Sequence, residues 1–118
     1  MKLYGIPNCN TVKKSRDWLK QHHIEVEFHD FKKLGLDTNI AQNWLKQTDW
    51  TKLVNRSGMT WRKLTEERKQ LVQNAPTALA LMQEKTSVIK RPILEKNGKI
   101  LHLGFDESAY SKIFNFRS

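Results

Sequence analysis

The chain has 118 residues, of which 38% are hydrophobic and 28% are charged, a size and composition typical of one globular domain. Lys and Arg number 21 and Asp and Glu number 12, so the formal net charge is +9. No apolar stretch reaches the length of a membrane-spanning helix, and the N-terminus carries no charged-then-apolar leader. These features exclude a membrane protein and predict a cytoplasmic protein with a single domain, residues 1–118.

The positive net charge suggests nucleic acid as a possible partner, but the distribution of the basic residues disfavours that interpretation. Basic residues are spread from Lys2 to Arg117 as single residues and short pairs, with no long basic run. No zinc-finger or RNA-binding aromatic signature accompanies them. Attraction to an anionic substrate or to an acidic protein surface explains the charge equally well, so the sequence does not predict a nucleic-acid partner.

The first predicted elements are a strand, a helix and a second strand. Residues 2–5 form a short apolar segment typical of a strand, and residues 10–22 carry an apolar stripe with helical spacing. Residues 25–31 alternate polar and apolar side chains, which predicts the second strand. A strand, a helix and a strand in this order favour a right-handed parallel unit.

Helices are predicted for the middle of the chain. Asp37 marks a helix cap, and the segment from about 49 to 84 has helical patterns interrupted by a loop at 55–58. Thr65 opens one of these helices, and Pro76 opens another because proline is favoured in the first helical turn. No strand is predicted in this block.

The last predicted elements are two strands and a helix. Residues 93–95 and 100–103 are strands joined by an Asn-Gly pair, the strongest short signal for a hairpin. Asp106 is placed to cap the final helix. The order β-α-β, helical insertion at about 37–88, then β-β-α predicts an α/β, thioredoxin-like fold with a mixed sheet flanked by helices.

Cys9 is the only cysteine in the chain, so any disulfide that it forms must be with another molecule. It lies between the first predicted strand and the first predicted helix. The free N–H groups and the positive end of the helix dipole favour an anion there, which lowers the pKa of a thiol. Cys9 is therefore a candidate catalytic nucleophile, with simple packing as the alternative for a free cysteine.

The residues after Cys9 favour the nucleophile. Asn10 and Thr11 are helix-capping residue types, which put the helix start within a residue or so of the thiol. Lys13 and the basic residues that follow it give the first turns of the predicted helix a positive charge. Helices ordinarily prefer carboxylates in these turns. An anion is the natural missing partner, so Asn10, Thr11 and Lys13 are predicted to bind the substrate or glutathione. A solvated basic face is the alternative.

The histidines do not predict a metal site. His22 and His23 are adjacent, and adjacent side chains on a helix do not converge on one ion. The other two, His29 and His102, have no ligand spacing.

Four segments carry a resemblance that extends over nearly the whole chain: 4–9 (YGIPNC), 53–58 (LVNRSG), 90–94 (KRPIL) and 104–107 (GFDE). Together they resemble the arsenate reductase-related (ArsC/Spx) family of the thioredoxin-like superfamily. Residues 60–64 (TWRKL) and Tyr110 look most like the YffB-like branch of that family.

The resemblance implies a Cys9 thiolate in an anion-binding loop, with Arg56 and Arg91 reaching toward the anion. An arginine can hold a carboxylate or oxyanion through two parallel hydrogen bonds, which a lysine cannot do. The resemblance also implies that Pro92 is a cis proline beside the cysteine. By itself the sequence shows only that Pro92 keeps Arg91 out of the helical region.

Two positions depart from the family pattern. Members that cycle through an internal disulfide carry a second cysteine three residues after the first, where this chain has Val12. An external thiol such as glutathione must therefore resolve the oxidised Cys9. Arsenate reductases carry a further arginine after the hairpin, where this chain has residues 104–107, so arsenate reduction is disfavoured.

These features predict a glutathione-dependent thiol-disulfide oxidoreductase, arsenate reductase-like, with Cys9 as its single nucleophile. It needs no bound cofactor; glutathione is the co-substrate, and the partner is glutathione or a small anionic thiol or disulfide. The alternative is an Spx-like regulatory protein that binds RNA polymerase or another acidic partner without catalysis. Trp61 and Arg62 are the candidate docking residues for that alternative, although Trp61 also suits core packing.

Overall fold

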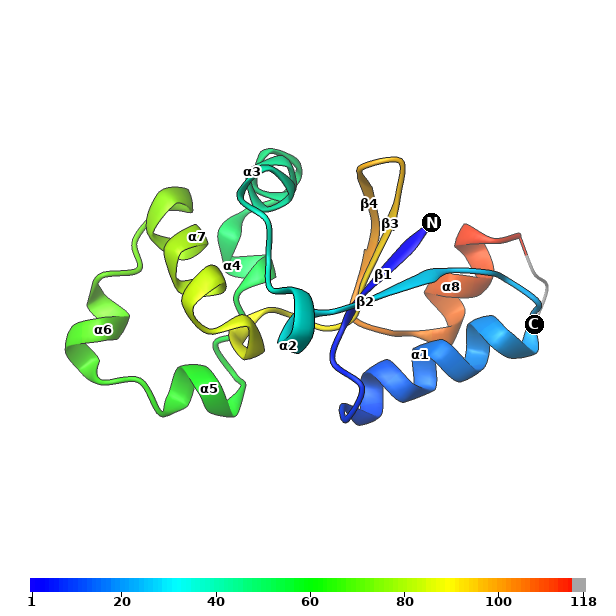
Figure 1. Ribbon diagram of the computed structural model, residues 1–118, viewed down its shortest axis with the longest axis horizontal. Coiled ribbons are helices and arrows are strands. Elements are labelled where there is room, and N and C mark those ends of the chain that lie inside the picture. Colours follow the sequence, from blue (N-terminus) through cyan, green and yellow to red (C-terminus); the bar gives the residue numbers. More distant parts are fainter. Residues whose placement is uncertain (116–118) are drawn as a thin grey trace. The chain divides into compact units, whose positions relative to one another are not determined.

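The computed structural model describes residues 1–115, and the chain divides into two compact units (Figure 1). The sheet unit joins Met1–Asp30 to the segment that begins at Arg91, and the helical unit is Phe31–Lys90. The elements of the sheet unit are β1 (Lys2–Gly5), α1 (Asn10–Gln21), β2 (Glu27–Asp30), β3 (Ile93–Lys96), β4 (Lys99–Leu103) and α8 (Glu107–Ile113). The elements of the helical unit are α2 (Phe31–Leu34), α3 (Thr38–Gln47), α4 (Trp50–Leu53), α5 (Met59–Arg62), α6 (Glu66–Gln70), α7 (Ala75–Glu84) and the 3₁₀ turn η1 (Thr86–Val88).

The four strands form one mixed sheet in the order β2-β1-β3-β4. β1 and β2 run parallel, whereas β1 with β3 and β3 with β4 run antiparallel. This arrangement confirms the predicted β-α-β and β-β-α halves and the mixed sheet with helices beside it. The predicted insertion at 37–88 lies inside the helical unit, which begins six residues earlier, at Phe31.

The core of the sheet unit lies between the sheet and the two helices α1 and α8. Leu3 and Leu94 from the sheet pack with Trp18 and Leu19 from α1 and with Tyr110 from α8. Since these residues come from both ends of the chain, the core holds the first and last segments together. The core also contains a polar pair. Ser15 Oγ and Tyr110 Oη are 2.8 Å apart and hydrogen-bonded, and both residues are fully buried.

The predicted hairpin is confirmed. Asn97 and Gly98 both have positive φ, 51° and 80°, as a tight two-residue turn between antiparallel strands requires. The predicted first helix ends at Gln21, with His22 as its C-cap. The predicted second strand is shorter than its alternating pattern, because Phe31 begins α2 and is 1% exposed in the helical unit. An alternating pattern of polar and apolar residues indicates which side chains are buried, but it does not indicate the residue at which the strand ends.

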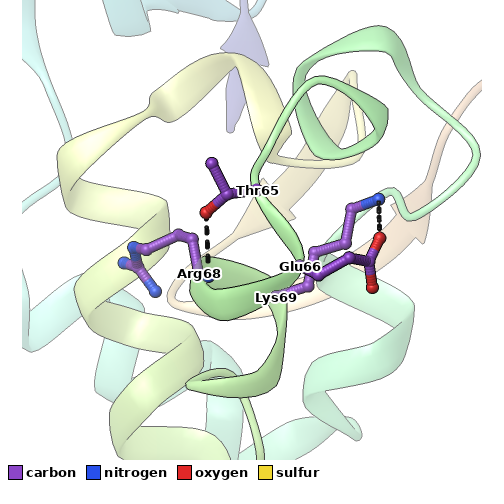
Figure 2. Close-up of polar contacts among 4 residues, drawn as sticks. All are labelled: Thr65, Glu66, Arg68 and Lys69. Atoms are coloured by element: carbon purple, nitrogen blue, oxygen red, sulfur yellow. Dashed lines mark hydrogen bonds and ion pairs between the residues drawn. The ribbon is translucent and has the colours of Figure 1, made fainter.

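The helical unit consists of short helices, of which α3, α4, α6 and α7 begin at side-chain caps. Asp37 accepts hydrogen bonds from two backbone N–H groups of α3, and Asn74 and Thr77 form a reciprocal capping box at α7. Figure 2 shows the start of α6, where Thr65 Oγ1 accepts a hydrogen bond from the Arg68 backbone N–H at 3.1 Å. These contacts confirm the predicted cap at Asp37 and the predicted start at Thr65.

Trp44 lies at the centre of the helical unit's core and is fully buried. It packs against Phe31 with the two rings nearly perpendicular and their centroids 6.4 Å apart. Val54 and Ile89 form an isolated bridge within the unit, which has no strand of its own. No helix within residues 1–115 combines the length and the apolar character needed to cross a membrane.

Candidate active site around Cys9

Cys9 itself occupies the N-cap position of α1, with an extended backbone (φ −105°, ψ 126°). Its carbonyl oxygen accepts the first helical hydrogen bond, from the Lys13 N–H at 2.9 Å. This confirms that the helix begins beside the cysteine, although the cap is Cys9 and not one of the capping-type residues around it. The thiol is partly exposed, so a reagent can reach it, which disfavours simple packing.

The start of α1 is held closely against the end of β1. A Cβ atom at Gly5 would lie 2.8 Å from Cγ2 of Val12, so only glycine lets the strand approach this side chain so closely. Val12 is fully buried. The position that carries a second cysteine in some family members is therefore occupied by the buried side chain of Val12. Its packing holds the first turn of the helix in place, together with the N–H groups near Cys9.

The pKa of Cys9 is lowered from the ordinary value of a thiol. Burial is the largest single influence and opposes this shift, because it disfavours the charged thiolate. The Val12 N–H, the Arg91 side chain and the Thr11 N–H each stabilise the thiolate, and together they outweigh burial. The neutral side chain makes no regular capping hydrogen bond, so these donors act chiefly on the charged form.

Arg91 and Pro92 lie immediately before β3. The peptide bond between them is cis, as the family resemblance implied. The Pro92 carbonyl accepts a hydrogen bond from the Gly104 N–H at 2.8 Å, which ties this turn to the end of β4. From this position the Arg91 side chain stabilises the Cys9 thiolate through its hydrogen-bonding capacity and its charge, and so lowers the pKa of Cys9.

The remaining predicted site residues are placed as follows. Asn10, Thr11 and Lys13 lie in the first turn of α1 with exposed side chains, and their role in binding an anion stays a prediction. Arg56 belongs to the helical unit, on an exposed loop, where its guanidinium lies 5.5 Å from the centre of the Trp50 ring. Its part in the Cys9 site also stays a prediction.

One contributor to the site and one buried polar pair of the sheet unit were missed from the sequence. The Val12 N–H was missed because position 12 was considered only for its side chain. Ser15 was missed although it interrupts the apolar stripe of α1 at a buried position, three residues after Val12. A serine on the buried face of a helix is a signal for a buried hydrogen-bond partner, and that partner is Tyr110.

The strand order, together with Cys9 and the cis Pro92, places the sheet unit in the thioredoxin-like class. A family model described as the ArsC family matches residues 4–113 of the chain. The chain belongs to the ArsC family.

Three comparisons show how the chain relates to known proteins. The solved structure of a protein named YffB is 40% identical with a TM-score of 0.87, over 94% of this chain and 96% of that one. An uncharacterized protein of Haemophilus influenzae is 43% identical over 95% of this chain and 96% of its own length. The global transcriptional regulator Spx 2 of Lactococcus lactis is 23% identical over 89% of this chain and 79% of its own length. The predicted membership of the ArsC/Spx family and the likeness to YffB are thereby confirmed.

Proposed function

We propose that this protein is a glutathione-dependent thiol-disulfide oxidoreductase in which Cys9 is the catalytic residue. The observation that carries the proposal is the surrounding of the sulfur by the Val12 N–H, the Arg91 side chain and the Thr11 N–H, which lower the pKa of Cys9. A thiolate is the reactive form of cysteine. The same donors make Cys9 a better leaving group in the second half of the reaction, because a thiol of lower pKa leaves a disulfide faster.

The reaction has two exchange steps that conserve atoms and electrons. The Cys9 thiolate attacks the glutathione sulfur of a mixed disulfide, forms a Cys9–glutathione disulfide and releases the substrate thiolate, which takes a proton from water. A second glutathione thiolate then attacks the bound glutathione sulfur and releases oxidised glutathione and the Cys9 thiolate. In sum, one mixed disulfide and one reduced glutathione become the substrate thiol and one oxidised glutathione.

An external thiol is needed in the second step because the chain offers no second cysteine. Position 12 carries the buried Val12, and Cys9 is the only cysteine in the sequence. Glutathione fits this role because its carboxylates suit a site that holds a fixed arginine, Arg91, and the cations of α1. A cytoplasmic location, where glutathione is abundant and reduced, stays a prediction.

The proposal is tested with hydroxyethyl disulfide and reduced glutathione, with oxidised glutathione formation coupled to glutathione reductase. Wild-type protein is expected to turn over, and Cys9→Ser is expected to have no activity above the uncatalysed rate. Intact mass after oxidation with glutathione should show one added glutathione on wild type and none on Cys9→Ser. Absence of the adduct on wild type, while a small exposed thiol in the same tube reacts, would contradict the proposal.

A second candidate function is regulation through a protein partner, favoured by the similarity to Spx 2 of Lactococcus lactis. RNA polymerase is the partner to test. The candidate docking segment, α5, contributes no buried residue, and Trp61 is partly exposed, so part of its side chain is open to a contact. This candidate predicts that the protein retains RNA polymerase from a lysate, that Cys9→Ser does so equally, and that Trp61→Ala does not. Thiol turnover without any such capture would exclude it.

A further inference from the structure

The sheet unit has a second feature that the thiol chemistry does not use. An open groove of about 820 Å³ runs between α1 and the edge strand β2. Leu19 and Val26 form part of its apolar lining, and Lys13, Arg16 and Phe28 line one end. From these features we infer that the groove binds an extended acidic segment of a partner protein, which adds to the sheet at the β2 edge.

The backbone of β2 supports strand addition. β2 is at one edge of the sheet and, within residues 1–115, pairs only with β1. The Glu27 N–H donates to the Met1 carbonyl at 3.0 Å, so the backbone groups of Glu27 face β1. Because alternate residues of a strand face opposite neighbours, the N–H and C=O groups of Val26 and Phe28 face outward. An added strand would pair with them.

The charges around the groove select the partner. Lys13 and Arg16 lie one turn apart on the same face of α1, and neither forms an ion pair within residues 1–115. The Arg16 guanidinium lies 4.2 Å from the centre of the Phe28 ring, which holds it at this end of the groove with its N–H groups available to a carboxylate. Two carboxylates on a bound segment would meet these two cations.

The opposite end of the groove has a different character. Ile24 and Val26 line it together with charges of both signs, Glu25 and Lys20, so a carboxylate gains no net attraction there. The bound segment therefore carries its carboxylates at the Phe28 end and apolar side chains at the Val26 end. The Cys9 thiol lies one helical turn before Lys13, so a bound segment lies close to the reactive sulfur.

The test uses the full chain with Cys9→Ser, so that its result does not depend on the thiol reaction. The probe is an end-blocked peptide, Glu-Thr-Glu-Thr-Val-Thr-Val-Thr, which places two carboxylates and two valines on one face of a strand. Binding is followed by backbone amide chemical shifts at low ionic strength. The largest changes are expected in α1 between Lys13 and Lys20 and in β2 at Phe28. A peptide with Gln in place of both Glu residues should bind about 10-fold more weakly, a total of about 1.4 kcal/mol for the two lost ion pairs.

Matched variants separate this groove from general attraction to a basic protein. Lys13→Gln with Arg16→Gln should weaken peptide binding about 10-fold. Lys46→Gln with Lys52→Gln removes the same charge from exposed positions in the helical unit and should leave binding unchanged. Equal weakening by the two double variants would overturn the inference.

Modified peptides test strand addition itself. N-methylation of alternate residues on one edge of the peptide removes the N–H groups that would pair with β2 and should abolish binding, whereas N-methylation of the other alternate set should be tolerated. Equal binding of both peptides would overturn the inference. So would displacement of the peptide by a single-stranded oligonucleotide of higher affinity, or dimerisation of the chain that blocks the same amides.

Discussion

The sheet unit and the helical unit are stabilised in different ways. The sheet-unit core joins Leu3, Leu94 and Tyr110, which are far apart in the sequence. The helical unit relies more on local contacts, such as the Asp37 and Asn74 caps that lie within three residues of their partners. The first unit thus fixes atoms from distant segments relative to one another. A reactive thiol needs that kind of support, and every group that lowers the pKa of Cys9 belongs to the sheet unit.

The largest effect is expected from Trp44→Ala in the helical unit. Trp44 is fully buried against Phe31, and such a truncation costs about 3–5 kcal/mol of unfolding free energy through lost burial and the cavity left behind. Urea unfolding followed by circular dichroism measures this loss. At pH values where the variant remains folded, the inflection of Cys9 alkylation should stay at its wild-type pH. A shift of that inflection to the ordinary thiol value would show that the thiol depends on the helical unit.

A smaller loss is expected from Tyr110→Phe in the sheet unit. The change removes the buried hydrogen bond to Ser15 and leaves that hydroxyl without its partner, at a cost of about 1–3 kcal/mol. Adding Ser15→Ala to Tyr110→Phe should recover part of the loss, because the unsatisfied hydroxyl is then removed. Urea unfolding at neutral pH measures Tyr110→Phe, Ser15→Ala and the double variant. If the double variant is less stable than the single one by the full additive amount, the pair does not act as a unit.

Tyr110 also gives the sheet unit a pH dependence. Burial raises the pKa of Tyr110 to about 12, although the hydrogen bond with Ser15 opposes the shift. The folded pKa lies above the unfolded value of about 10, so this contribution to stability is complete below about pH 10 and is lost as pH rises through the folded pKa. As pH rises from about 10 to about 12, the unfolding free energy of the wild type should therefore fall more than that of Tyr110→Phe. Unfolding in urea at a series of alkaline pH values, with both proteins at equal ionic strength, checks the difference.

Much of the fold was predictable because its signals are local. Asp37 and Thr65 cap helices in the structure as their residue types predict, and the Asn-Gly pair forms the hairpin. The boundary at Phe31 was not predictable, because its burial comes from packing in the helical unit. At the site, the position of Cys9 at a helix start could be predicted, whereas the contribution of the Val12 N–H depends on the path of the backbone. The pairing of Ser15 with Tyr110 joins residues 95 positions apart, and no local pattern contains it.

Helix caps offer a more direct comparison between the units. Asp37 caps α3 with two hydrogen bonds, and Asp37→Ala should lower the unfolding free energy by about 1 kcal/mol. Cys9 occupies the same position in α1 without a regular capping bond. Cys9→Ser should therefore raise the unfolding free energy, by up to about 1 kcal/mol, at a pH where the thiol is neutral. Thermal unfolding at a pH below the measured inflection of Cys9 alkylation tests both. A destabilised Cys9→Ser would show that the neutral thiol already supports the helix as well as a serine does.

The smallest expected effect separates the two arginines. The Arg91 side chain, in the same unit as Cys9, lowers the pKa of Cys9, whereas Arg56 belongs to the helical unit. Arg91→Ala should therefore move the inflection of Cys9 alkylation by iodoacetamide to higher pH. Arg91→Lys should place the inflection between those of wild type and Arg91→Ala, because the lysine ammonium keeps the charge but lacks the planar set of N–H donors of arginine. Arg56→Ala should leave the inflection unchanged.

The pH dependence of stability gives an independent reading of the same interaction. Because the folded pKa of Cys9 lies below the unfolded value, its contribution to stability is present above the unfolded pKa and is lost as pH falls through the folded one. This loss of stability with falling pH should be smaller in Arg91→Ala than in wild type, and it should be unchanged in Arg56→Ala. If Arg56→Ala instead raises the alkylation inflection as much as Arg91→Ala does, the helical unit contributes charge to the thiol, and the separation between the two units argued above is wrong.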